Sequence, residues 1–234
     1  MVGGHISAAT TMAAAAVVGL LLAGSEARPR AAGRSKSAPL VRLDVLLTVS
    51  PDLRDPARRT LLDEAERIWR HEQVELRWPS PAGGTEPPGA PLRVLVIPRP
   101  DTAAREQRWP VAELVTHAGH RAMAIASIAG ARRVVDEAAR YQLIEHPGHL
   151  EYRLGLVLGR AVAHEIGHFL LATGTHAPEG LMRATVDAGE FAALSTETFR
   201  LDDHAREWMR ERLGDSPVIT ALRSSGFSYS RGAP

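Results

Sequence analysis

The segment LGLVLGRAVAHEIGHFLLATGTHAPEGLM, residues 154–182, carries a long apolar run with the motif HExxH near its end. The apolar run predicts a helix over residues 151–171 that lies inside the fold, and Gly and Pro break the segment that follows. Residues i and i+4 share one face of a helix, so the imidazoles of His164 and His168 can bind one metal ion. Glu165 projects beside them and can take up a proton as a general base.

A catalytic zinc site has three protein ligands and one open position. His176 follows His168 by eight residues, and Gly174 can end the helix and turn the chain back toward the metal. The sequence therefore favours His176 as the third ligand, with a carboxylate of Asp187 or Glu190 as the alternative. Three imidazoles suit Zn²⁺ best, although Co²⁺, Ni²⁺ and Cu²⁺ also bind nitrogen ligands.

HEIGHFLLATGTHAPEGLM, residues 164–182, resembles the metzincin clan of zinc endopeptidases, whose HExxHxxGxxH helix is followed by a methionine turn. It looks particularly like the small bacterial members, in which a very short stretch separates the third ligand from the methionine, here Met182. The chain departs from the clan at Leu171, where the clan has glycine, and at Gly174, where the clan has its third histidine. The stretch between His168 and His176 is therefore two residues longer than the corresponding stretch of the clan.

The resemblance implies a zincin-like fold and a chemical role for each residue of the motif. His164, His168 and His176 would hold Zn²⁺. Zinc would activate a water molecule, and Glu165 would accept its proton and pass it to the leaving amine. The substrate would be a peptide or protein, bound as an extended strand along the sheet edge near residues 121–128.

The hydrophobic pattern predicts one α+β domain over residues 39–215. The expected strands, of which the last two have the weaker signal, span residues 40–49, 74–78, 92–97, 121–128 and 132–136. The expected helices span residues 58–71, 151–171 and 200–213. Together with the resemblance, this order predicts a zincin-like mixed β-sheet with two packed helices, the second carrying HExxH, and a short C-terminal helical subdomain.

The amino-terminal region has the pattern of an export signal. Residues 7–23 are uncharged and largely apolar, and small residues follow at the two positions that a signal peptidase recognises. The sequence therefore predicts a signal peptide over residues 1–27 and a protein exported to the periplasm or the extracellular space, with an uncleaved membrane anchor as the alternative. Residues 28–38 are expected to form a disordered basic leader and residues 216–234 a flexible tail.

The composition excludes several classes of protein. The 234-residue chain has 28 basic and 27 acidic side chains and a net charge of +1, unlike a strongly basic nucleic-acid-binding protein. It has no cysteine, which excludes a disulfide scaffold, a cysteine-ligated metal and a thiol nucleophile. We expect a monomer that binds no nucleic acid and does not stay inserted in a membrane once its signal is cleaved.

Three further residues have both a functional and a structural interpretation. His117 and His120 are expected to be surface histidines, with a second metal site as the less favoured alternative. Arg160, one turn before His164, is expected either to pair with a carboxylate such as Asp136 or to lie at the surface.

Taken together, these patterns favour an exported zinc-dependent endopeptidase. The alternative is a catalytically inert zincin-fold binding protein of the cell envelope that keeps a structural zinc. Glu165 favours the enzyme, because it is not a ligand and a structural site needs no base. A third possibility is an envelope interaction module that acts through the basic leader and the Pro-rich loop at residues 79–91, and it predicts a function that survives loss of the histidines.

Overall fold

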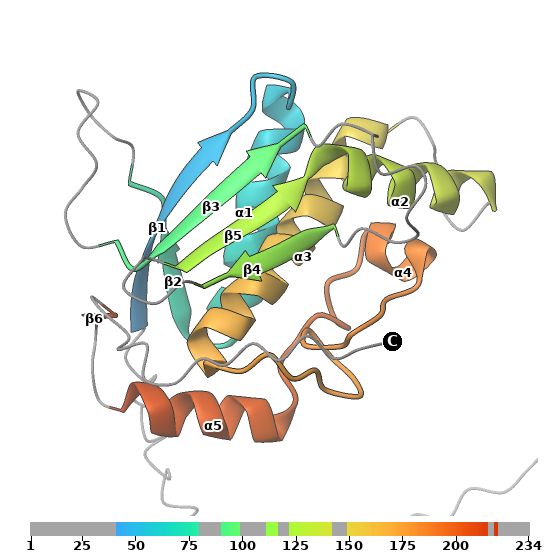
Figure 1. Cartoon of the computed structure of the whole chain (residues 1–234). Helices are drawn as coiled ribbons and strands as arrows, with labels where there is room; N and C mark the ends of the chain where they lie inside the picture. The colour runs from blue at the N-terminus through green and yellow to red at the C-terminus, as the bar shows by residue number, and fades with distance from the viewer. Residues whose placement is uncertain are drawn as a thin grey trace, which may run out of the picture. The chain divides into compact units, whose positions relative to one another are not determined.

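A computed structural model (Figure 1) describes residues 41–79, 90–98, 111–116, 122–141, 149–214 and 218–219. The predicted signal peptide, the basic leader, and His117 and His120 lie outside the described residues, as does most of the Pro-rich loop. Of the predicted tail, the structure describes only residues 218 and 219.

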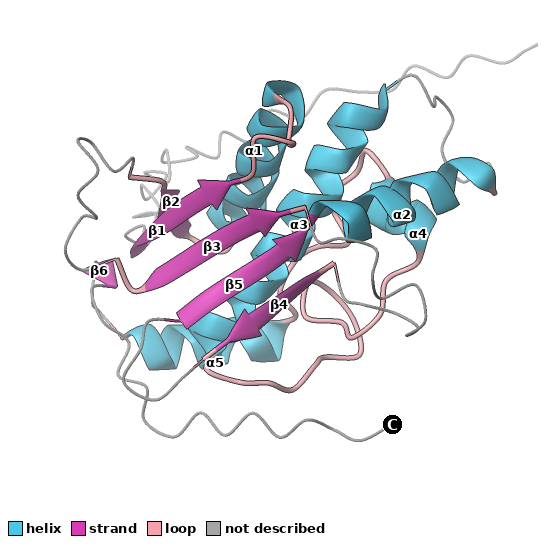
Figure 2. Ribbon diagram, turned by 45° about the horizontal axis from the view of Figure 1, so that its top comes forward, coloured by secondary structure: helices cyan, strands magenta, loops and turns pink. Residues whose placement is uncertain are grey.

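The strands of the sheet are β1 (Val41–Val49), β2 (Val74–Arg77), β3 (Leu92–Ile97), β4 (Ala112–Val115), β5 (Ala122–Ser127) and β6 (Val218–Ile219). Five of them follow the order β2-β1-β3-β5-β4, and the short β6 pairs with β1. Every pairing is parallel except that between β4 and β5, which is antiparallel. The prediction of a mixed sheet is therefore confirmed (Figure 2).

Two helices, α1 (Asp55–His71) and α3 (Leu150–Leu171), pack against each other on one face of the sheet (Figures 1 and 2). Glycines on α3 allow the close approach. A Cβ on Gly155 would lie 2.5 Å from the carbonyl oxygen of Ala57, and one on Gly159 would lie 2.7 Å from that of Leu61. Any larger residue at these positions would push α3 away from α1.

The helix α3 is the centre of the domain. By length and composition it could cross a membrane, yet 89% of its most apolar 18-residue stretch is buried inside the fold. A helix that is apolar on all sides is stable in water only when other elements surround it. This burial agrees with the sequence-based prediction of a helix inside the fold.

Three shorter helices complete the described part of the domain: α2 (Ile128–Arg140), α4 (Ala188–Ala192) and α5 (Asp203–Leu213). The helix α2 packs against α3 and α4. The motif HExxH therefore lies on the third helix of the described residues, where the sequence predicted the second. Neither α4 nor β4 was predicted, because each has at most five residues and too few for a periodic pattern.

The prediction of a strand over residues 132–136 is wrong, because these residues lie in α2. The side chain of Ser127 accepts a hydrogen bond from the Gly130 N–H at 3.1 Å and caps the helix. Ala131 and Val135 lie one turn apart on its buried face. This spacing of buried residues decides the helix over the local preference of valine for strands.

Candidate metal centre

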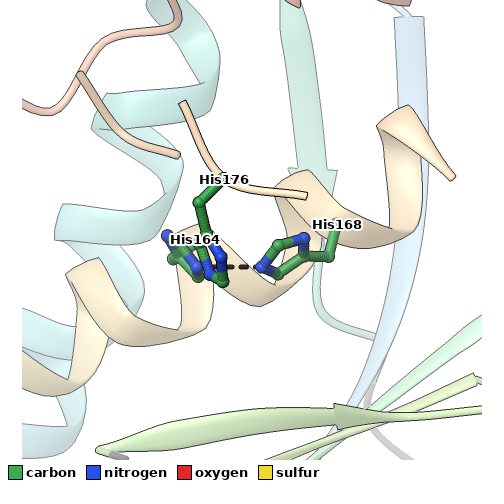
Figure 3. A group of neighbouring side chains, drawn as sticks. All are labelled: His164, His168 and His176. Atoms are coloured by element: carbon green, nitrogen blue, oxygen red, sulfur yellow. Dashed lines mark hydrogen bonds between the residues drawn. The ribbon is translucent and has the colours of Figure 1, made fainter. Parts of the chain in front are cut away.

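Three histidine rings converge near the carboxyl end of α3 (Figure 3). His164 and His168 lie one turn apart on α3, and His176 comes from the segment that follows the helix. One nitrogen of each ring lies within 4.8 Å of the corresponding nitrogens of the other two. The structure thus brings together the three residues that the sequence predicts as ligands. Within the described ranges, no other group of three or more histidines and carboxylates is placed to hold a metal ion.

A left-handed residue directs the chain back toward the two helical histidines. Ala172 has φ 48° and ψ 44°, and the N–H of Thr173 donates to the carbonyl of His168 at 3.3 Å. The sequence predicted this turn at Gly174, which has no positive φ. The turn lies two residues earlier because the last carbonyls of α3 find their donors there.

Backbone carbonyls fix the proton positions on two of the rings. Nδ1 of His164 lies 2.7 Å from the carbonyl oxygen of Leu181, and Nδ1 of His168 lies 2.7 Å from that of Thr173. A carbonyl oxygen only accepts hydrogen bonds, so each Nδ1 carries the proton and each Nε2 has a free lone pair. Second partners of this kind orient metal-binding histidines.

The Nε2 atoms of His164 and His168 face each other at 3.0 Å. Two lone pairs at this distance repel each other unless a positive charge lies between them. Tetrahedral zinc, with Zn–N distances of about 2.0–2.1 Å, holds neighbouring ligand nitrogens roughly 3.3 Å apart. The arrangement therefore fits a metal ion bound by the Nε2 atoms.

Loss of hydration favours the neutral form of the three imidazoles. It lowers the pKa of His164 to about 4, and the neighbouring His168 adds to this effect. Burial also lowers the pKa of His168 and the pKa of His176. The neutral imidazole is the form that binds metal, so protons compete weakly for the site at neutral pH.

Glu165 contributes a buried carboxyl beside the histidines, with 6% of the residue exposed. Burial raises the pKa of Glu165 to about 8; the hydrogen bond from the Leu114 N–H opposes this rise, and the nearby charge of Glu113 adds to it. A carboxyl whose pKa is close to neutral can both accept and return a proton.

A tight turn places Met182 against α3 between the two helical histidines. Gly180, with φ 73°, begins the turn, and Met182 is 3% exposed. A Cβ on Gly167 would lie 2.3 Å from the Sδ atom of Met182, so α3 has room for the methionine because residue 167 is glycine. The same turn supplies the Leu181 carbonyl that orients His164.

The two acidic residues considered as alternative ligands have other partners. Glu190 accepts two hydrogen bonds from Arg183, at 3.0 and 2.6 Å, and this contact lowers the pKa of Glu190. The side chain of Asp187 accepts from the backbone N–H groups of Gly189 and Glu190 and so caps α4. Neither belongs to the group that surrounds the candidate metal position.

A cavity of about 630 Å³ opens beside the three histidines, between β4, α2, α3 and the segment that follows Leu181. The strand that borders it, β4, is at the edge of the sheet, whereas β5 has partners on both sides. The expectation that residues 121–128 form the edge is therefore wrong. Strand order depends on packing between segments far apart in the chain, and the short β4 gave no periodic signal of its own.

The free side of β4 points toward the cavity. The Ser127 N–H donates to the Val111 carbonyl at 2.8 Å, and hydrogen-bonding direction alternates along a strand. Ala112 and Leu114 therefore direct their N–H and C=O groups away from β5. The hydrogen bond from the Leu114 N–H to Glu165 agrees with this direction.

Arg160 lies in the interior, and the expectations of a surface position or a pairing with Asp136 are wrong. Its guanidinium binds the Glu64 carboxylate at 2.7 Å, and neither side chain is exposed. It also donates to backbone carbonyls of Glu190, Phe191 and Ser195. Glu64 was not predicted as the partner, because no local pattern in the sequence shows that α1 and α3 meet in the folded chain.

No family model matches the sequence, and no curated protein matches it. Among solved structures, archaemetzincin from Methanopyrus kandleri aligns with a TM-score of 0.38 and 12% identity over 75% of this chain and 96% of that chain. The GM1-bound form of the ECX AB5 holotoxin aligns with a TM-score of 0.40 and 11% identity over 72% of this chain and 78% of that chain. Because both TM-scores are low, the assignment of a function depends on the side chains described above.

Proposed function

We propose that the chain is an exported, metzincin-like zinc endopeptidase in which His164, His168 and His176 hold the metal and Glu165 is the general base. One observation carries the proposal. Two Nε2 atoms with free lone pairs face each other at 3.0 Å, and a third imidazole and a buried carboxyl lie beside them. All-nitrogen ligation favours Zn²⁺ as the metal.

Each residue then has a defined task. Zinc, when bound, would polarise the scissile carbonyl and lower the pKa of a water molecule, so that the water could be deprotonated and attack near neutral pH. Glu165 accepts the proton of the attacking water and returns it to the leaving amine. The outward N–H of Ala112 and the outward C=O groups of Ala112 and Leu114 hold the peptide as an added strand at the edge of the sheet, while the Leu114 N–H stays with Glu165.

The competing proposal is an inert binding protein with a structural zinc. Structural zinc sites are closed by four protein ligands, whereas three histidines here border an open cavity. A structural site also has no use for the buried carboxyl of Glu165. Both features support the enzyme.

The test compares metal content with peptide cleavage. Purified protein from residue 28 onward should contain about one zinc per chain by elemental analysis, and it should cleave peptides in a mixed library analysed by mass spectrometry. Glu165→Ala should keep the zinc and lose activity by about 10²–10⁴-fold, because proton transfer is lost. Glu207→Ala, the same change at an exposed position on α5, is the matched control. Tight zinc binding without cleavage of any peptide would favour the binding protein.

A further inference from the structure

The turn at residues 180–182 controls the position of two of the three histidine rings. The Leu181 carbonyl accepts from Nδ1 of His164 at 2.7 Å and so orients that ring. The Met182 carbonyl accepts from the N–H of Ala177, the residue directly after the third histidine, at 2.8 Å. Any displacement of the turn therefore changes the geometry of the candidate metal centre.

Arg183 directly follows this turn and holds its first carbonyl. The Nε of Arg183 donates to the Gly180 carbonyl at 3.1 Å, and its two terminal nitrogens donate to the carboxylate oxygens of Glu190 at 3.0 and 2.6 Å. A two-point contact of this kind fixes the plane of the guanidinium as well as its position. The side chains of Arg183 and Glu190 are only 20% and 28% exposed, so the pair is largely sheltered from water.

The other end of this contact is anchored to α3, the helix that carries HExxH. Glu190 lies on α4, and its backbone carbonyl accepts from the guanidinium of Arg160 on α3 at 3.1 Å. Arg153, also on α3, donates to the Ala192 carbonyl of α4 at 2.6 Å. The contacts therefore form a closed path from α3 through α4 and Arg183 to the turn, and back to α3 at the first histidine of the motif.

Arg183 cannot be a ligand, because a guanidinium only donates hydrogen bonds. It can affect a bound cation in two ways, by repulsion between like charges or through the position of the turn. The two ways have opposite signs. Repulsion predicts that loss of the arginine strengthens zinc binding, whereas loss of position predicts that it weakens zinc binding.

We propose that Arg183 is a positioning residue of the candidate metal centre. Its contacts hold the turn in the position from which the Leu181 carbonyl orients His164. Loss of an outer partner of a metal-binding histidine weakens metal binding about 10- to 100-fold, and Arg183 acts one step further out, so its loss should cost about tenfold. The inference rests on the metal site of the proposed function and is independent of cleavage.

The first experiment measures zinc affinity by titration of the chelator-treated protein against a chromophoric chelator. Arg183→Met keeps most of the length of the side chain and removes its donors, so the Kd for zinc should rise about tenfold. Arg183→Lys should give a smaller rise, because a single ammonium does not reproduce the planar fork. Glu190→Gln should change the Kd little, because its amide oxygen still accepts from Arg183. An unchanged or lower Kd in Arg183→Met would overturn the inference.

Arg42→Met is the matched control. It also removes an arginine paired with a glutamate, because Arg42 contacts Glu75 at 3.1 Å, but this exposed pair joins β1 and β2 away from the histidines. Its Kd for zinc should equal that of the wild type. An equal rise in both variants would show that loss of any such pair weakens zinc binding, which contradicts the role of Arg183.

Cobalt spectroscopy distinguishes positioning from a general loss of stability. Co²⁺ binds the same nitrogen ligands, and its visible absorption depends on their geometry. The bands of Co²⁺-loaded Arg183→Met should differ from those of the wild type, and those of Arg42→Met should not. A lower urea midpoint with unchanged bands and an unchanged Kd for zinc would make the role of Arg183 merely structural. If Arg183→Met does not fold, the same comparisons with Arg183→Lys decide the question.

Peptide cleavage by the same proteins separates this inference from the proposed function. Wild-type protein that binds zinc and cleaves nothing overturns the endopeptidase, while a tenfold higher Kd in Arg183→Met still supports the positioning role. Wild-type protein that cleaves peptides, with an unchanged Kd but a higher KM in Arg183→Met, makes Arg183 a substrate contact and overturns the positioning role alone. Wild-type protein that binds no zinc overturns both.

Discussion

At the scale of single residues, Ala172 stores strain at the turn that follows the two helical histidines. Its left-handed conformation costs a residue with a Cβ about 1–2 kcal/mol and costs glycine little. We expect Ala172→Gly to raise the free energy of unfolding by about 1 kcal/mol, measured by urea denaturation. Ala193→Gly is the matched control, because Ala193 ends α4 with φ −63° and gains nothing from glycine. If both changes destabilise the protein equally, Ala172 is not strained.

The identity of the third ligand is a second prediction at this scale. Loss of an outer partner of a metal-binding histidine typically weakens metal binding 10- to 100-fold, and loss of a ligand costs at least as much. His176→Ala should therefore weaken zinc binding by more than about tenfold in competition with a chromophoric chelator. Glu190→Gln should leave the affinity near the wild-type value, because Arg183 already holds that carboxylate. The reverse result would assign the third ligand to Glu190.

The stability of the metal-free protein should report the buried carboxyl of Glu165. Its pKa is raised from 4.5 to about 8, so between these values the folded state binds more protons than the unfolded state. This contribution to the free energy of unfolding is complete below pH 4.5 and is lost as pH rises through 8. The lowered pKa of His164 acts in the opposite direction between pH 4 and 6.5. This effect is the same in the wild type and in a variant that changes only Glu165, so it cancels when the two are compared.

Glu165→Gln isolates the effect, because glutamine does not titrate. Between pH 5 and 8, the melting temperature of chelator-treated wild type should fall relative to that of the variant, at roughly 2–4 °C per kcal/mol of lost stability. Thermal scans at unit intervals of pH measure the difference. Parallel curves for the two proteins would show that the carboxyl of Glu165 ionises normally.

At the scale of elements, the pair of Glu64 and Arg160 joins α1 to α3 and to the segment after α4. Removing one partner of a buried ion pair costs about 3–5 kcal/mol when it leaves an uncompensated charge. Glu64 also binds Arg67, which stays in the Arg160→Met variant. We therefore expect Arg160→Met to destabilise the protein by about 3 kcal/mol, measured by urea denaturation. The double variant with Glu64→Gln should lose less than the sum of the two single changes. Additive losses would show that the two side chains stabilise the fold independently.

The elements that the sequence predicted correctly are those with long periodic patterns. The 17 residues of α1 and the 22 of α3 carry apolar residues at helical spacing, and the buried run LRVLVI predicts β3. The elements that the sequence did not predict are short or depend on contacts between segments far apart in the chain. Val134 and Val135 favour a strand locally, but the buried face of α2 makes them helical. The position of β4 at the edge follows from pairing with β5, which no local pattern encodes.

At the scale of the whole molecule, the candidate site draws on segments with very different signals. The spacing of His164 and His168 is a local property of one helix, and it predicted their convergence. His176 required only a turn, and the sequence placed it correctly beside them. The walls of the cavity come from α2, β4 and the segment after Leu181, which meet only in the folded domain. The sequence therefore indicated the candidate metal centre but not the walls of the cavity beside it.

Export is the prediction that concerns the chain as a whole. Residues 7–23 are uncharged and apolar, and Ser25 and Ala27 stand where a signal peptidase requires small residues. Expression of the full chain in a bacterial host should therefore yield a protein outside the cytoplasm whose amino terminus, by mass spectrometry, is Arg28. Ala27→Leu should block cleavage, because the peptidase pocket does not admit a large side chain, and Ala32→Leu should leave cleavage intact. Wild-type protein that begins at Met1 and sediments with the membrane would instead identify the segment as an anchor. The endopeptidase proposal would stand in either case, because none of its residues lies before Ala112.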